Sequence, residues 1–191
     1  MEPGHGDGVA IARAVFQAYL EHKMPEDLIC EVIAWACAGW REDEVVTFAR
    51  DVVVRGGVAS RRHLELEPVF AWARDAGVEA FLVSASPRPV VEAAGALWGF
   101  DREHTLATTA RFERGIMVTH VVRPIPYGPG KAVQLEARLG GRVLLAAFGD
   151  NVFDVPMLQA ARVPVVVEPK PRLLARLVEM GGFEPVQVRT G

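Results

Sequence analysis

Hydrophobic residues recur at two different spacings along the chain, and the change of spacing divides the sequence in two. From residue 9 to about residue 55, apolar side chains return every three or four positions, as they do on one face of an α-helix. Beyond about residue 60, helical stretches alternate with short apolar runs of strand length. This alternation is typical of a parallel sheet covered by helices. The pattern predicts a helical region over 1–57 and an α/β domain over 58–191.

The individual elements follow from the same periodicity. In the first part, we expect helices at 9–23, 25–40 and 41–57. The third of these is ambiguous, because its β-branched valines also favour a strand. In the second part, we expect helices at 60–77, 87–99, 130–140, 154–161 and 171–181, strands at 78–86, 142–149 and 163–169, and a β-hairpin at 105–122 that turns at Glu113–Gly115.

Composition narrows the class of protein. The 191 residues carry a formal net charge of −3 and are 50% hydrophobic, which is typical of a globular chain. Nucleic-acid binding is not expected, because the sequence offers no basic stripe. No apolar run approaches the length of a membrane span, and the first residues do not resemble a signal peptide. We therefore expect a cytoplasmic protein with no membrane partner.

The cysteines and tryptophans favour ordinary packing. Cys30 and Cys37 are seven positions apart, which places them on one helical face and too far apart for a disulfide, so free thiols are expected. Trp35 and Trp40 either line an apolar pocket or simply pack in the core. Trp72, like Trp98, is expected to cover the sheet.

Two strand or loop ends carry groups suited to an anion. Ligands of parallel sheets bind at the carboxyl ends of the strands. The run ending in Ser84 and Ser86 precedes a helix, so its hydroxyls and the helix N–H groups favour an anion, although capping of the helix by Ser86 is the alternative. Lys131 stands in the first turn of a later helix, where a cation is electrostatically unfavourable unless an anion lies nearby. A solvated surface lysine is the alternative there.

A third strand end carries two carboxylates. The apolar run from Val143 to Phe148 stops at Gly149, and Asp150 and Asp154 follow. Capping of the next helix would account for Asp154 but leaves Asp150 unexplained. Hard oxygen ligands at a strand end suit Mg²⁺. A hydroxyl, a cation and paired carboxylates are together the groups that phosphoryl transfer requires.

The ordered set "VSAS", a lysine at a helix start and "FGDNVFD" resembles the haloacid dehalogenase superfamily, and most of all its phosphoserine phosphatase-like branch. The resemblance covers about residues 60–180. It implies a three-layer, Rossmann-like parallel sheet with helices on both faces, and a small helical cap over 1–57. It further implies that Ser84 and Lys131 bind the phosphoryl group, that Asp150 ligates Mg²⁺, and that Asp154 supports the lysine and the metal's water shell.

The function implied is Mg²⁺-dependent hydrolysis of a small phosphomonoester, a phosphorylated metabolite, through an aspartyl-phosphate. The family's first motif, a strand followed by Asp-x-Asp-x-Thr, supplies the nucleophile, and no Asp-x-Asp occurs in the chain. The N-terminal stretch offers only Asp7, with no apolar strand before it. The alternative is therefore a non-catalytic, HAD-like module that binds phosphate or a partner.

The same absence affects the sheet, because the family's first strand lies in its middle. Either the sequence lacks that N-terminal strand, or the sheet is completed by a different strand order or by another chain. A cap that begins within ten residues of Met1 favours the first explanation. An exposed sheet edge would favour a homo-oligomer.

Overall fold

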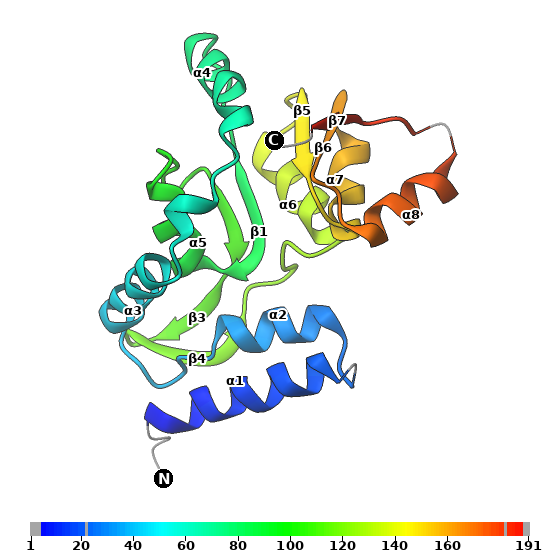
Figure 1. Cartoon of the computed structure of the whole chain (residues 1–191). Coiled ribbons are helices and arrows are strands. Elements are labelled where there is room, and N and C mark those ends of the chain that lie inside the picture. The colour runs from blue at the N-terminus through cyan, green and yellow to red at the C-terminus, as the bar shows by residue number, and fades with distance from the viewer. Residues whose placement is uncertain (1–4, 22, 182, 189–191) are drawn as a thin grey trace. The chain divides into compact units, whose positions relative to one another are not determined.

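The computed structural model describes residues 5–21, 23–181 and 183–188. Within it the chain forms two compact units, Met1–Ile125 and Pro126–Gly191, which are considered one at a time. Figure 1 labels their helices and strands. The division of the chain into a cap over 1–57 and a core over 58–191 remains a prediction from the sequence.

The first unit begins with three helices: α1 (His5–Leu20), α2 (Glu26–Ala34) and α3 (Glu42–Arg55). Pro25 stands at the N-cap of α2, and acidic residues occupy its first turn, where the helix dipole favours them. The ambiguous third segment is a helix, as expected. Val45, Ala49 and Val53 are buried at intervals of four residues, so one face of α3 packs inward despite its valines.

The helix expected at 60–77 is shorter than its periodicity indicated. Two 3₁₀ turns, Val58–Arg61 and Leu64–Leu66, precede α4 (Glu67–Asp75), and Pro68 lies in the first turn of that helix. Ala73 is the buried residue of α4, whereas Trp72 is 58% exposed. The expectation that Trp72 covers the sheet is therefore wrong, since adjacent helical positions point about 100° apart.

A β-α-β unit follows. Strand β1 (Leu82–Pro87) pairs in parallel with β2 (Thr105–Thr108), and α5 (Arg88–Ala96) connects them. The expected hairpin is present only in its second half, where β3 (Ala110–Glu113) and β4 (Ile116–Val121) are antiparallel. Arg114 and Gly115 both have positive φ at its turn, which suits the twist of a hairpin.

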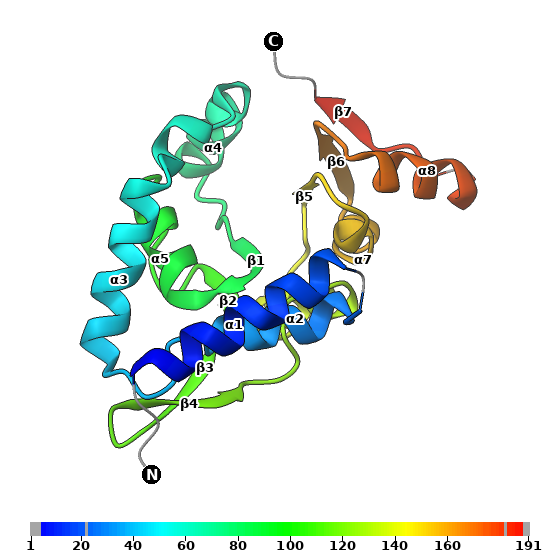
Figure 2. The same ribbon diagram turned by 60° about the horizontal axis from the view of Figure 1, so that its bottom comes forward.

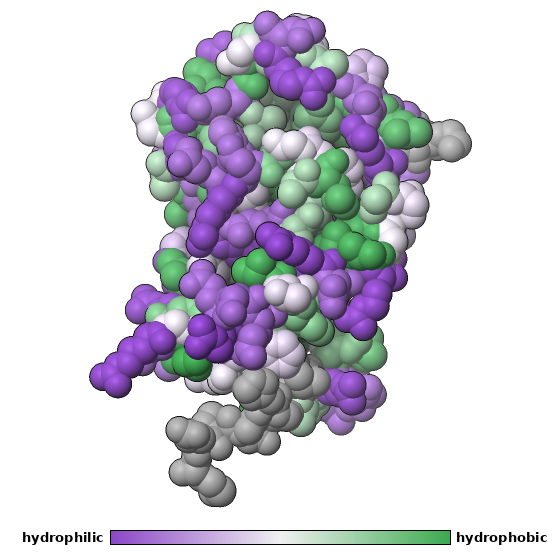
Figure 3. All heavy atoms as spheres, turned by 90° about the vertical axis from the view of Figure 1, so that its left-hand side faces the viewer, coloured by the Kyte–Doolittle hydropathy of each residue, from purple (hydrophilic) through white to green (hydrophobic). Residues whose placement is uncertain are grey.

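The hairpin packs against the helices of the same unit (Figure 2). Val45, Ala110 and Met117 form a buried cluster. Trp35 and Trp40 are among the side chains packed against it, so they serve as packing, the simpler of the two alternatives. On the face that carries α3, hydrophilic and hydrophobic residues are interspersed (Figure 3).

The second unit holds a three-stranded parallel sheet in the order β5 (Ala146–Gly149), β6 (Val163–Val167), β7 (Val186–Val188). Its helices are α6 (Pro129–Leu139), α7 (Val155–Ala160) and α8 (Pro171–Met180). Leu158 of α7, Val166 of β6 and Leu173 of α8 are almost fully buried, so each of these elements contributes to the core of this unit. The short strand β7 was not expected from the sequence.

The fold is mixed α/β with small parallel sheets, which agrees with the expected class at that level. A single continuous sheet was expected, and the structure has separate parallel sheets of two and three strands. Among the described residues, β1 pairs only with β2 and β5 pairs only with β6. Each of these strands therefore has one edge whose N–H and C=O groups lack a strand partner.

Candidate phosphoryl-binding site

Three of the four residues singled out in the sequence lie in the second unit, at the carboxyl end of its sheet. Gly149 ends β5, and the chain continues through Asp150 into a 3₁₀ turn, Val152–Asp154, and then α7. Lys131 approaches from the first turn of α6. This edge is where ligands bind in parallel α/β sheets.

Lys131 is held in place by the geometry of the α6 start. Gly128, at the N-cap, has a φ of 50°, and Pro129 begins the helix. The Lys131 backbone N–H donates to the Gly128 carbonyl at 3.1 Å. Its side chain is only 13% exposed and forms an ion pair with Asp154. Lys131 is therefore not a solvated surface lysine, and a carboxylate offsets the cation at this helix start.

Asp154 is the most buried charged group of the site, with a side chain 4% exposed. Its Oδ1 accepts from the Lys131 ammonium. Its Oδ2 accepts from the backbone N–H groups of Asp150, at 3.1 Å, and Asn151, at 2.9 Å. Although Asp154 occupies the N-cap position of α7, it makes no side-chain capping bond there. The carboxylate therefore organises the loop after β5 and positions Lys131.

Gly149 is required by the same arrangement. A Cβ added at this position would lie 2.6 Å from the Cβ of Asp154 and 2.8 Å from its Oδ2. Real Cβ contacts are never so short. The glycine thus lets the loop after β5 fold back on itself closely enough for the Asp154 carboxylate to receive both backbone N–H groups.

Asp150 has a different environment. Its side chain is 50% exposed, and its Oδ2 lies 2.7 Å from the Nζ of Lys170. The Lys170 backbone N–H also donates to the Asp150 carbonyl, at 2.8 Å. Lys170 was not among the residues expected at the site from the sequence. The available signal was its place just after the β6 strand, at the same sheet edge as Asp150.

Two aromatic residues and an arginine adjoin these groups. The rings of Tyr127 and Phe153 are 4.4 Å apart, and the Arg172 guanidinium lies 5.1 Å from the centre of the Phe153 ring. Lys131 and Lys170 each pair with one of the two carboxylates, Asp154 and Asp150, and Arg172 adds a cationic side chain over the Phe153 ring.

Ser84 lies in the first unit, at the end of β1. Its Oγ accepts the backbone N–H of Ser86 at 3.2 Å. Ser86 itself is exposed and does not cap α5, whose N-cap residue is Pro87 and has no side-chain capping bond. The alternative in which Ser86 caps the helix is therefore wrong. The Ser84 hydroxyl proton is left to donate elsewhere.

The described residues hold neither an Asp-x-Asp sequence after a strand nor a complete metal centre. Asp7 belongs to helix α1, and its side chain lies outside the described part. No group of three or more His, Cys, Asp or Glu side chains among the described residues is placed to hold a metal ion. Asp150, with a side chain 50% exposed, offers an accessible carboxylate at this sheet end. Mg²⁺ usually takes one or two protein carboxylates together with phosphate oxygens and waters, so Asp150 fits as one member of such a set.

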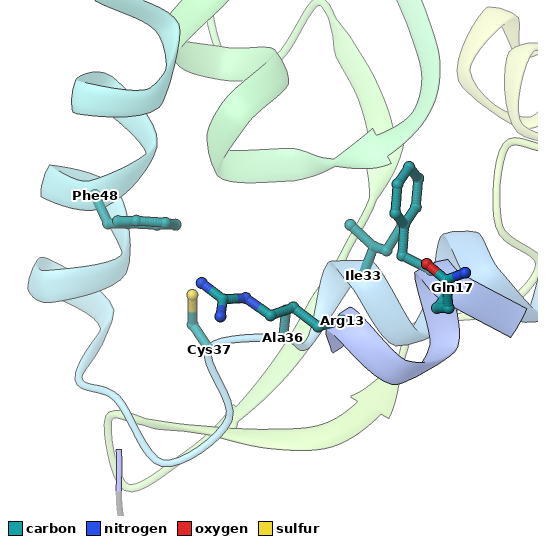
Figure 4. A pocket seen from close by; sticks show the side chains of 7 residues that line it. Arg13, Gln17, Ile33, Ala36, Cys37 and Phe48 are labelled. Atoms are coloured by element: carbon teal, nitrogen blue, oxygen red, sulfur yellow. The ribbon is translucent and has the colours of Figure 1, made fainter. Parts of the chain in front are cut away.

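The first unit also contains an apolar pocket. It has a volume of about 520 Å³ and is lined by residues of α1, of α2 and the turn after it, and of α3 (Figure 4). Phe16, Ile33 and Phe48 form apolar walls, and Arg13 is the charged residue in the lining. Burial raises the pKa of the Cys37 thiol, also in the lining, so this thiol remains protonated at neutral pH. Neither Cys30 nor Cys37 is part of a disulfide in the described structure, as the sequence predicts.

The sequence profile of the family described as haloacid dehalogenase-like hydrolase matches residues 5–159. The chain therefore belongs to this family of hydrolases. No curated protein matches the chain. No described helix is long and apolar enough to cross a membrane.

Solved structures share the fold at low sequence identity. A protein of unknown function from Bordetella pertussis Tohama I is 19% identical with a TM-score of 0.74, over 96% of this chain and 85% of that one. A HAD family hydrolase from Salmonella enterica serovar Typhi is 18% identical with a TM-score of 0.61, over 93% of this chain and 56% of that one. A probable phosphoserine phosphatase from Vibrio cholerae is 15% identical with a TM-score of 0.63, over 94% and 52%. The chain thus spans about half the length of the last two structures.

Proposed function

We propose that this chain binds the phosphoryl group of a small phosphorylated metabolite, and that it belongs to a Mg²⁺-dependent phosphomonoester hydrolase whose nucleophile these residues do not supply. The observation that carries the proposal is the ion pair between the largely buried Lys131 side chain and the buried Asp154 at the carboxyl end of the β5 strand. Burying a lysine is costly unless it is paired, and its ammonium still has protons to donate to an anion.

Each residue has a proposed part. Lys131 neutralises the phosphoryl oxygens, and Asp154 holds the ammonium in position through Oδ1 while Oδ2 fixes the loop. Ser84 is proposed to donate its hydroxyl proton to a phosphoryl oxygen, a role that rests on the family motif. Asp150 would hold Mg²⁺, which when bound supplies positive charge to the phosphoryl oxygens.

Hydrolysis through an aspartyl-phosphate requires a carboxylate that attacks phosphorus, and the chain contains no Asp-x-Asp. We therefore place the nucleophile on a strand outside these residues. The test is a variant in which a strand ending in Asp-x-Asp-x-Thr precedes residue 1. It should hydrolyse a generic phosphomonoester when Mg²⁺ is present. A folded variant that remains inactive would count against the hydrolase.

A second candidate function is a non-catalytic module that binds phosphate or a partner. The missing Asp-x-Asp favours it. Calorimetric titration of the chain with inorganic phosphate and Mg²⁺, together with native mass spectrometry, tests this alternative. Binding of phosphate or a defined oligomer is expected, and a monomer that binds neither ligand contradicts it.

A further inference from the structure

We propose that Lys170 is a built-in counter-cation for Asp150, which competes with a divalent metal ion for this carboxylate. The inference rests on the proposed function, because it takes Asp150 as part of the phosphoryl site. What it adds is a role for Lys170, and with it a reason why this carboxylate should bind metal weakly.

The backbone around Lys170 is shaped for this contact. Just after β6, Glu168 has a φ of 43°, a left-handed conformation that is costly for a residue with a side chain. Its N–H donates to the Val188 carbonyl at 3.1 Å. Pro169 and Pro171 then flank Lys170 and restrict the chain on both sides. The turn is thus held so that the Lys170 N–H meets the Asp150 carbonyl.

The identity of the residue also needs an explanation. Lys170 is the N-cap of α8, a position where Ser, Thr, Asn and Asp are preferred and where the helix dipole disfavours a cation. Lysine therefore contributes nothing as a cap. The 2.7 Å contact between its Nζ and Asp150 Oδ2 supplies the compensation.

The two lysines of this unit differ in how firmly they are paired. The Lys131–Asp154 pair is 13% and 4% exposed, whereas the Lys170–Asp150 pair is 56% and 50% exposed. A pair with little exposure separates rarely, because each charge would then be buried without a partner or water to solvate it. A half-exposed pair is weak and opens readily, because water can replace the partner. Asp150 can therefore exchange its ammonium for another cation.

Competition follows from the chemistry of the shared oxygen. Mg²⁺ binds carboxylate oxygens at about 2.0–2.1 Å. An ammonium bonded to the same carboxylate blocks part of that approach and repels a dication a few ångströms away. Because exposed pairs are weak, losing Lys170 should tighten metal binding about two- to fivefold.

The experiment titrates the chain with Mn²⁺ alone and follows free Mn²⁺ by electron paramagnetic resonance. The variants are Lys170→Gln and, as the matched control, Arg176→Gln. The control removes one positive charge from the same helix, where Arg176 pairs with Glu179. We expect Lys170→Gln to lower the Kd two- to fivefold, Arg176→Gln to leave it within error, and Asp150→Asn to abolish the gain in Lys170→Gln. The unfolding temperature of Lys170→Gln should change by less than about 3 °C.

The proposal is overturned if Lys170→Gln binds Mn²⁺ no more tightly than the wild type, or if Arg176→Gln raises the affinity for Mn²⁺ equally. It is also overturned if neither the wild type nor Lys170→Gln binds Mn²⁺. Phosphate binding in EDTA is measured separately. If the wild type binds no phosphate, the proposed function is contradicted. If the Lys170→Gln substitution leaves the affinity for Mn²⁺ unchanged, only the role of this lysine is contradicted.

Discussion

Lys131, with a side chain only 13% exposed, forms an ion pair with the buried Asp154, although the two are 23 positions apart in the sequence. The pair joins the first turn of α6 to the loop that leaves β5. The position of the Lys131 ammonium therefore depends on the correct folding of the loop after β5.

Replacing Lys131 with methionine should destabilise the protein by about 3 kcal/mol, because the Asp154 carboxylate would stay buried without its cation. Urea unfolding measures this loss. The double variant Lys131→Met, Asp154→Leu should recover part of it, since no charge then remains buried. Single and double variants as stable as the wild type would show that the pair is not buried in solution.

Substituting alanine for Gly149 should lower the free energy of unfolding by about 1–3 kcal/mol, as overpacking does elsewhere. Gly149 does not have a positive φ, so the backbone accepts alanine and the effect is due to the clash with Asp154. Thermal or urea unfolding provides the measurement. An unchanged midpoint would mean that the loop after β5 does not lie against Asp154 as described.

Ser84 and Ser86 offer a matched comparison two residues apart. Ser84→Ala should weaken the binding of inorganic phosphate severalfold, because a hydroxyl donor is lost. Ser86→Ala should leave binding unchanged, since Ser86 is exposed. Calorimetry of both variants distinguishes them. If Ser84→Ala and Ser86→Ala bind phosphate with equal affinity, Ser84 does not contact the phosphoryl group.

The raised pKa of Cys37 predicts slow alkylation. The thiolate is the reactive form, and a pKa above the usual value leaves less thiolate at pH 7.5. The rate of alkylation should therefore still be rising at pH values where that of an ordinary thiol has levelled off. Labelling a Cys30→Ser variant with iodoacetamide isolates Cys37, and the same variant in urea is the reference. Equal rates in the folded and unfolded chains at pH 7.5 would contradict the buried position of the thiol.

Local patterns predicted the elements whose neighbours are close in sequence. The turn at Arg114 and Gly115 lies where the sequence predicts it, and α3 forms over a segment whose valines also allowed a strand. Trp72 was misplaced because α4 buries its neighbour Ala73, which leaves Trp72 58% exposed. The strand β7 is three residues long, too short to show a period.

The sequence could suggest the candidate site only through residue types that stand out at strand and helix ends. Lys131 at a helix start and two aspartates after an apolar strand are unusual enough to stand out. Lys170 was missed because its partner is 20 positions earlier, and only the parallel pairing of β5 with β6 brings the two loops to one edge. The closeness of Gly149 to Asp154 is also visible only in three dimensions.

The most direct test of the account is the calorimetric titration of inorganic phosphate into the wild-type chain and into Lys131→Met, with circular dichroism confirming that the variant is folded. A hydrogen bond to a charged group is worth about 1.5–3 kcal/mol, so the variant should bind phosphate about ten- to a hundredfold more weakly than the wild type. Absence of binding to the wild type, or equal affinity in the folded variant, would contradict the assignment of a phosphoryl site to Lys131.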